Sequence, residues 1–269
     1  MTKFKSVINK SYYGIITYIE DDTNIDELEA TIKHNLDVFK EFKNIIVATN
    51  FSSYNLVSLY ELAWKKYFPD CIFLHNEFNR GHGFGTADLD ISIFDYCKNN
   101  NIKWLCKGAG DVLLYPELLD IEIEIADFYY INAIGKGGIE KYNSDFDRII
   151  EEDFFPQTNF YAIDVSKCDY LSDKKKLDSQ YQKSQNHPFP YSDLTQPPIQ
   201  FCWEGDLAGC IDRNNLTKQH LVSKKYYREL LKFIEEYDIH DPSHKNIWIE
   251  GVCHYHIFGK PIYKLGGDA

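Results

Sequence analysis

The segment NIDELEATIKHNLDVFKEFKNIIVATN, residues 24–50, joins a helical pattern directly to a strand pattern. Its apolar residues recur at the spacing of one helix face, at Leu28, Ile32, Leu36 and Phe39. Asn24, followed three residues later by Glu27, resembles a capping pair at the start of that helix. The run NIIVATN at 44–50 is rich in β-branched residues, and it predicts a buried strand.

Strand and helix patterns also alternate on both sides of this segment. Strand patterns cover residues 14–20, 44–50, 71–76 and 102–107, and helix patterns cover 24–42, 53–68 and 85–100. Strands that alternate with helices are typical of a parallel sheet covered by helices, so we expect an α/β fold. Ligands in such folds bind outside the carboxyl ends of the strands. Those ends are predicted at residues 17–20, 48–50, 76–83 and 107–111.

The second half of the chain is less regular. Residues 126–135 and 159–166 predict strands of a mixed extension of the sheet. Residues 172–200 are polar and lack periodicity, so we expect a long loop there. A helix is predicted at 223–237, and a short strand lies in NIWIEGVCHYHIFGK near the end. The chain shows no internal repeat or linker, which favours a single domain over 1–269.

Composition excludes several classes of protein. The net charge is −12, and the longest basic block is KKK at 174–176, which disfavours a nucleic-acid binder. Seven cysteines without a C-x-x-C pair argue against a disulfide framework and a zinc ribbon, and they favour the reducing cytoplasm. The opening MTKFKSVINKSYYG does not resemble a signal peptide. No apolar run approaches the roughly 20 residues of a membrane span.

The first candidate site is NEFNRGHGFGTADLD, residues 76–90, which joins the third strand to the third helix. Its glycines allow a ligand to approach the backbone closely, and the following helix offers unpaired N–H groups to an anion. The candidate residues are Asn79, Arg80, Gly81 and Gly83, with Arg80 able to reach a phosphate. The alternative is a flexible connection of an α/β protein. The pattern is neither a Walker motif nor a dinucleotide fingerprint.

The second candidate is GAGD, residues 108–111, at the end of the fourth strand. A lone Asp after small residues is commonly a turn former. Its position at the carboxyl edge of the sheet favours a different hypothesis, in which the Asp111 carboxylate holds a divalent cation on a diphosphate. The pattern alone is compatible with both.

The third candidate is FCWEGDLAGCIDR, residues 201–213, which contains Glu204 and Asp206 at the start of a short predicted helix. Acids at a helix start are favoured by the helix dipole alone. In a cleft with aromatic walls, one of these carboxylates could instead act as a general base for a sugar hydroxyl. The sequence leaves both interpretations open.

The fourth candidate is GVCHYHIF, residues 251–258. In a strand, His254 and His256 would lie on the same face, because side chains alternate between faces. Two imidazoles can contribute to a metal site, although a zinc site requires further ligands. Surface histidines without a metal are the alternative.

The order of these elements resembles the GT-A class of nucleotide-sugar glycosyltransferases, and it is most similar to inverting family 2, over roughly residues 12–260. In that family the first strand ends at the nucleotide base, which implies base contacts for Thr17 and Glu20. The second strand ends in a polar residue that faces the base, and Asn50 occupies that place. The family's Asn/Gly-rich segment is similar to NRGHGFGTA, and we include Lys107 among the expected donor contacts.

The family's D-x-D motif corresponds to GAGD here, which keeps only Asp111. The resemblance implies a Mn²⁺ or Mg²⁺ ion at Asp111, completed by His254 or His256. The family's catalytic acid motif is similar to WEGDLAGCIDR, in which Gly205 separates the two acids. Alignment on the following Leu-Ala favours Glu204 as the base, and alignment on the acid pair leaves Asp206 open.

The resemblance therefore implies a Rossmann-like GT-A domain with a nucleotide-binding half (12–120) and an acceptor-binding half (121–269). The expected activity is transfer of a hexose from a nucleotide-diphosphate donor, most simply a UDP-sugar, to a hydroxyl by direct displacement with inversion. The expected partners are the donor and a glycan, lipid-linked or protein-linked acceptor, as in carbohydrate biosynthesis.

Three alternatives compete with this activity. The first is a GT-A-like protein with a weakened metal motif that binds a nucleotide sugar or glycan without turnover. A sugar nucleotidyltransferase has a similar sheet, but its Gly-rich loop would stand where this chain has the acidic EDDTN. A metallohydrolase based on histidine lacks a compact ligand set.

Overall fold

The computed structural model describes residues 2–19, 24–51, 54–76, 79–80, 83–110, 112–114, 116–132, 154, 156–185, 203–221, 247–249 and 252–254. The first half alternates between strand and helix, as predicted. Its main strands are β2 (Ser11–Ile19), β3 (Asn44–Phe51), β4 (Ile72–Asn76) and β5 (Trp104–Ala109). The helices between them are α2 (Asn24–Phe39), α3 (Tyr54–Tyr67) and α4 (Phe84–Asn99).

Shorter elements surround this unit. Before β2 lie β1 (Thr2–Lys3) and α1 (Lys5–Ile8). After β5 follow β6 (Val112–Leu114), the 3-10 helix η1 (Pro116–Asp120), β7 (Glu122–Ile123), β8 (Phe128–Asn132), β9 (Pro156–Asp164) and the 3-10 helix η2 (Val165–Lys167). The remaining elements are α6 (Lys174–Gln185), α7 (Trp203–Arg213), β10 (Lys218–His220), β11 (Ile247–Ile249) and β12 (Val252–His254).

The central sheet has the strand order β10-β8-β9-β5-β2-β3-β4. Strands β5, β2, β3 and β4 are parallel to one another, whereas β9 runs antiparallel to both β5 and β8. Strand β10 is parallel to β8. The predicted α/β fold, with a mostly parallel sheet flanked by helices and a mixed extension, is confirmed. Its carboxyl edge is where a ligand site is expected.

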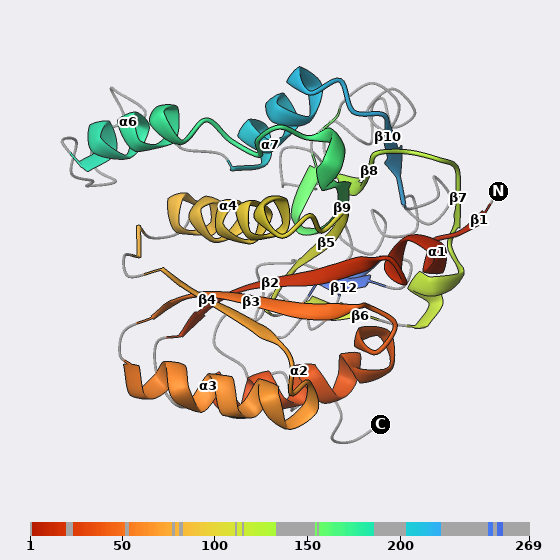
Figure 1. The fold of residues 1–269 in the computed structure, drawn as a ribbon, viewed down its shortest axis with the longest axis vertical. Helices are drawn as coiled ribbons and strands as arrows, with labels where there is room; N and C mark the ends of the chain where they lie inside the picture. The colour runs from red at the N-terminus through yellow and green to blue at the C-terminus, as the bar shows by residue number, and fades with distance from the viewer. Residues whose placement is uncertain are drawn as a thin grey trace.

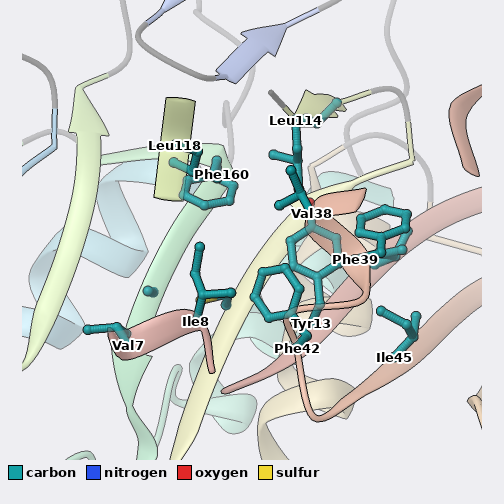
Figure 2. Packing of buried hydrophobic residues seen from close by; sticks show 14 of the residues in the cluster. Val7, Ile8, Tyr13, Val38, Phe39, Phe42, Ile45, Leu114, Leu118 and Phe160 are labelled. Carbon is teal, nitrogen blue, oxygen red and sulfur yellow. The ribbon is translucent and has the colours of Figure 1, made fainter. Parts of the chain in front are cut away.

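Helices cover both faces of the sheet (Figure 1). On the face covered by α2 and α3, the ring of Tyr13 packs 4.8 Å from that of Phe42 and 5.1 Å from that of Phe39, as Figure 2 shows. On the other face, α4 and α7 bury Ile93, Leu207 and their apolar neighbours. Each fully buried side chain of this size contributes about 1.5–3 kcal/mol through removal from water. The two cores hold the carboxyl edge in a fixed position.

The prediction of a long loop over residues 172–200 is wrong in part. Residues 174–185, within the predicted loop 172–200, form helix α6. The carboxylate of Asp173 caps this helix by accepting hydrogen bonds from the N–H groups of Lys175 (3.0 Å) and Lys176 (3.2 Å). Its apolar anchors are the buried Leu177 and Tyr181, which packs edge-on against Phe84. Two anchors produce no periodic stripe, so the sequence pattern did not reveal the helix.

Two further predictions meet different outcomes. The predicted helix at 223–237 lies outside the described residues. The short strand expected near the end of the chain is found as β11 and β12, which pair antiparallel with each other. Within the described part of the chain, none of the helices combines the length and apolar character required to cross a membrane.

Candidate functional site

The parallel strands end side by side at one edge of the sheet. In the register of β2 with β3, Thr17 lies opposite Thr49, and the next pair along β3 and β4 is Asn50 with Asn76. On the other side of β2, Ile16 lies opposite Ala109, the last residue of β5. The predicted strand ends therefore meet at a single edge, as a ligand site between them requires.

Asn50 lies at this edge beneath the start of α4. Its side chain is 3% exposed, and among the described residues its Oδ1 atom has no hydrogen-bond partner. A Cβ atom on Gly85 would lie 3.0 Å from Asn50 Nδ2 and 3.0 Å from Asn79 Oδ1. Gly83, which precedes the helix, has a φ of 87°, in the region that favours glycine. The structure thus brings three predicted donor contacts, Asn50, Asn79 and Gly83, close to the first turn of α4.

Arg80 forms ion pairs with two aspartates and a contact with an aromatic ring. Its Nε and Nη2 atoms donate to the two oxygens of Asp88 at 2.7 and 2.8 Å, and its Nη1 donates to Asp178 at 2.7 Å. The guanidinium also lies 5.1 Å from the centre of the Tyr181 ring. Burial raises the pKa of Asp88, although Arg80 opposes this effect. Arg80 therefore joins the segment before α4 to helix α6.

Thr17 contacts the small residues at the end of β5. Gly110 donates its N–H to the carbonyl of Ile16 at 2.9 Å, and a Cβ atom at position 110 would lie 3.2 Å from Thr17 Oγ1. The backbone of β5 thus approaches the end of β2 closely, directly before Asp111 in the chain. Asp111, Glu20 and Gly81 themselves lie outside the described residues.

Strand β12 brings His254 to the same part of the fold. It pairs antiparallel with β6, with His254 opposite Val112, the residue that follows Asp111 in the chain. The side chain of His254 and all of His256 lie outside the described residues. Among the side chains that are described, no group of three or more His, Cys, Asp or Glu could hold a metal ion.

The two acids of α7 have different surroundings. Glu204 Oε1 accepts a 2.9 Å hydrogen bond from Thr158 Oγ1, at the start of β9. Asp206 is held through both oxygens, by Ser172 Oγ at 2.7 Å and by Lys176 Nζ at 2.7 Å. Asp206 therefore anchors helix α6 and the residues before it to α7. Glu204 lies beside the strand that borders β5.

Lys107 lies inside the protein. Its side chain is fully buried, its Nζ atom is 3.2 Å from Asp90 Oδ1, and it donates a hydrogen bond to the carbonyl of Thr158. Trp203, the first residue of α7, donates from Nε1 to the other oxygen of Asp90 at 2.6 Å. Burial raises the pKa of Asp90, opposed by the Lys107 ammonium and by the Trp203 hydrogen bond. Lys107, expected from the sequence as a donor contact, is thus held by Asp90 and Thr158 inside the protein.

Asp90 and Trp203 are the residues that sequence reasoning missed. A signal was present for Asp90, because it shares one helix face with Ile93, Phe94 and Cys97, all of which are buried. A lone carboxylate on an apolar helix face indicates a buried polar contact. Its partner could not be identified from spacing, because Lys107 lies on a different element.

The chain is similar to solved protein structures at low sequence identity. No family model and no curated protein matches the chain. It is similar to the galactosyltransferase LgtC in complex with donor and acceptor sugar analogues, at 12% identity, over 93% of this chain and 88% of that one, with a TM-score of 0.48. It is also similar to the mannosyltransferase PcManGT from Pyrobaculum calidifontis in complex with GDP-Man and Mn²⁺, at 9% identity, over 83% and 60%, with a TM-score of 0.43. Both of these proteins are glycosyltransferases by name.

Proposed function

We propose that this chain is a glycosyltransferase that transfers a sugar from a nucleotide-diphosphate donor, a UDP-sugar, to a hydroxyl of a glycan or another acceptor. The observation that carries the proposal is the composition of the carboxyl edge. Asn50 and Thr17 lie at adjoining strand ends, the glycine-containing start of α4 lies against Asn50, and Glu204 lies beyond β5. This arrangement supports the proposal, in which the polar groups contact the nucleotide and the carboxylate contacts the acceptor.

Residues 12–120 would bind the donor in this proposal. Thr17, Glu20 and Asn50 would contact the base and ribose. The Oδ1 of Asn50, which has no hydrogen-bond partner within the described residues, offers an acceptor for an N–H or O–H group. Asn79, Gly81 and Gly83 would border the diphosphate at the start of α4, where the helix dipole favours an anion. Residues 121–269, which contribute Thr158 and Glu204, would bind the acceptor.

The proposal includes a divalent cation near the end of β5. The pairing of His254 with Val112 brings a histidine of the last strand beside the residue that follows Asp111. We propose that Asp111, with His254 or His256, holds Mn²⁺ or Mg²⁺, because a carboxylate oxygen and an imidazole suit such an ion. When bound, the cation would neutralise charge on the diphosphate.

Glu204 is the base in the proposed mechanism. It takes the proton of the acceptor hydroxyl while that oxygen forms a bond to the anomeric carbon, and the bond from this carbon to the diphosphate oxygen breaks with its electron pair. Attack from the opposite face inverts the anomeric configuration. We favour Glu204 over Asp206 because both oxygens of Asp206 are held by Ser172 and Lys176. General-base assistance contributes about 10²–10⁴-fold to the rate.

A second function is supported by the sequence GAGD, which keeps one acid where the related motif has two. In this alternative the chain binds a nucleotide sugar or a glycan without turnover. We place either function in the cytoplasm, because the five cysteines of the described part are free thiols.

Calorimetry with a panel of nucleotide sugars, with and without Mn²⁺, separates these functions. A transferase binds at least one donor and releases the nucleoside diphosphate when an acceptor or water is present. A binder shows the same affinity without release. Absence of binding to every donor in both conditions would contradict both the transferase and the binding of a nucleotide sugar without turnover.

A further inference from the structure

Asp90 and Lys107 form a charge pair inside the protein, between α4 and β5. Both side chains are fully buried, and the Asp90 Oδ1 and Lys107 Nζ atoms are 3.2 Å apart. Because removing two charges from water is costly, such a pair contributes little net stability compared with apolar residues of similar volume. Its structural effect lies in the groups that the two side chains hold in place.

Asp90 holds the beginning of α7. Its Oδ2 atom accepts the 2.6 Å hydrogen bond from the indole N–H of Trp203, which is itself 2% exposed. Trp203 is the first residue of α7, and Glu204 follows it directly. A buried indole with a fixed hydrogen bond restricts the position and rotation of the helix start. Asp90 thereby restricts the backbone from which the Glu204 side chain extends.

Lys107 acts on Glu204 by a second route. Its ammonium donates to the carbonyl oxygen of Thr158, and the hydroxyl of Thr158 donates to Glu204 Oε1 at 2.9 Å. The Lys107 contact thus holds the backbone of Thr158, whose side chain in turn holds one oxygen of the carboxylate. One route fixes the backbone of Glu204, and the other fixes its carboxylate.

We infer that Asp90 and Lys107 are positioning residues that fix the Glu204 carboxylate for proton transfer, through Trp203 and Thr158. The inference rests on the proposed role of Glu204 as the base. Correct placement of a reacting group accounts for a large part of catalysis, and a displacement of about 1 Å can cost about 10²-fold in rate. Neither positioning residue contacts the substrate.

Thr158 provides the sharpest test, because its side chain can be changed while the carbonyl that Lys107 contacts is kept. Thr158→Val removes the hydroxyl, and Thr158→Ser retains it. We expect Thr158→Val to lower kcat by about 10–100-fold, since the carboxylate loses its orienting contact, with the KM for the donor unchanged. Thr158→Ser is expected to restore most of kcat. Equal activity of the two variants, or a parallel loss of donor affinity, would overturn the inference.

The charge pair is tested by the double variant Asp90→Leu/Lys107→Met, which leaves no buried charge and no acceptor for the Trp203 indole N–H. Hydrogen exchange of a peptide covering α7 (203–213) is expected to become faster, whereas exchange of α2 (24–39) stays the same. The matched control is Lys3→Met/Asp120→Asn, which removes an exposed ion pair between β1 and η1 and should change neither exchange nor activity. Unchanged exchange in α7 of the folded double variant would overturn the positioning role.

The two hypotheses fail in different ways. If the wild-type protein releases no nucleoside diphosphate from any donor, the proposed function fails, while the exchange measurement still tests whether the pair holds α7. If the wild type is active and Thr158→Val retains full kcat, the positioning inference fails and the proposed function stands. Should the double variant not fold, the comparison of Thr158→Val with Thr158→Ser decides whether the positioning inference holds.

Discussion

Gly85, in the first turn of α4, lies against Asn50 at the end of β3, and a Cβ atom at position 85 would come within 3.0 Å of Asn50 Nδ2. Such a contact is tighter than most real Cβ contacts, so a side chain at position 85 would require the Asn50 amide to shift by a few tenths of an ångström. Because the same Cβ would also lie 3.0 Å from Asn79 Oδ1, both expected donor contacts depend on this one position.

The variant Gly85→Ala is therefore expected to weaken donor binding by about ten-fold or more, equivalent to about 1.4 kcal/mol. Replacement of a helical glycine by alanine otherwise favours folding by up to about 1 kcal/mol, so a loss of binding without a matching loss of thermal stability identifies a local effect.

Gly209→Ala is the control for this variant, because its Cβ would meet only the flexible end of Arg213, at 3.1 Å. It should leave donor affinity unchanged by calorimetry. Equal donor affinity of Gly85→Ala and the wild type would contradict the expectation that this contact positions Asn50 and Asn79 for the donor.

The buried charge pair predicts a non-additive effect on stability. Lys107→Met leaves Asp90 without its cation, and loss of one partner of a buried pair costs about 3–5 kcal/mol of unfolding free energy. The double variant Asp90→Asn/Lys107→Met should be more stable than Lys107→Met alone. Urea denaturation of the single and double variants measures this coupling, and additive losses would contradict it.

The pair also predicts the direction of a pH effect. Burial raises the pKa of Asp90, and removal of Lys107 removes the main charge that opposes this rise. The folded Lys107→Met variant then binds a proton that the unfolded chain releases above its pKa of about 3.9. Its stability should therefore fall as pH rises from acid toward neutral, and a rise over this range would contradict the assignment.

The Asp127 carboxylate predicts the opposite dependence of stability on pH. Burial raises its pKa, but hydrogen bonds from Lys167 and Thr217 outweigh this effect and lower it. The stability that Asp127 contributes is present above the unfolded pKa of about 3.9 and is lost as pH falls through the lower folded value. The thermal midpoint of Asp127→Asn should lie below that of the wild type at neutral pH, with a smaller difference at about pH 3. A difference that does not change with pH would exclude this role.

Thiol reactivity tests the packing of the core. The chain has seven cysteines, of which five lie buried in the described part, and burial raises the pKa of Cys71 to about 11 and that of Cys106 to about 12. Because the thiolate is the reactive form, these groups should resist a disulfide reagent at about pH 8. We expect at most two of the seven thiols to react in the native protein and all of them after denaturation in guanidinium chloride. Rapid reaction of more than two would contradict the core packing.

The sequence was informative where burial produces a regular pattern. Helix α2 begins at Asn24 as predicted, and β3 extends over Asn44–Phe51 against a predicted 44–50. It was uninformative where polar contacts decide the structure. Helix α6 depends on the Asp173 cap and on ion pairs such as Lys176 with Asp206, and these produce no periodic signal.

The candidate site also combines features that the sequence predicted with contacts that it did not. The strand ends that carry Thr17 and Asn50 followed from the order of elements, because parallel strands share one carboxyl edge. The pairing of Asp90 with Lys107 joins a helix to a strand through side chains, and that of His254 with Val112 joins strands far apart in sequence. Neither contact follows from local spacing, and both required coordinates.

The central claim is that Glu204 takes a proton from an acceptor hydroxyl during sugar transfer. The most direct test is the release of nucleoside diphosphate from the donor that binds best, compared between the wild type, Glu204→Gln and Asp206→Asn. We expect Glu204→Gln to lose about 10²-fold or more in kcat while binding the donor as the wild type does, and Asp206→Asn to lose much less. Full turnover by Glu204→Gln, with turnover abolished in Asp206→Asn, would contradict the assignment of the base.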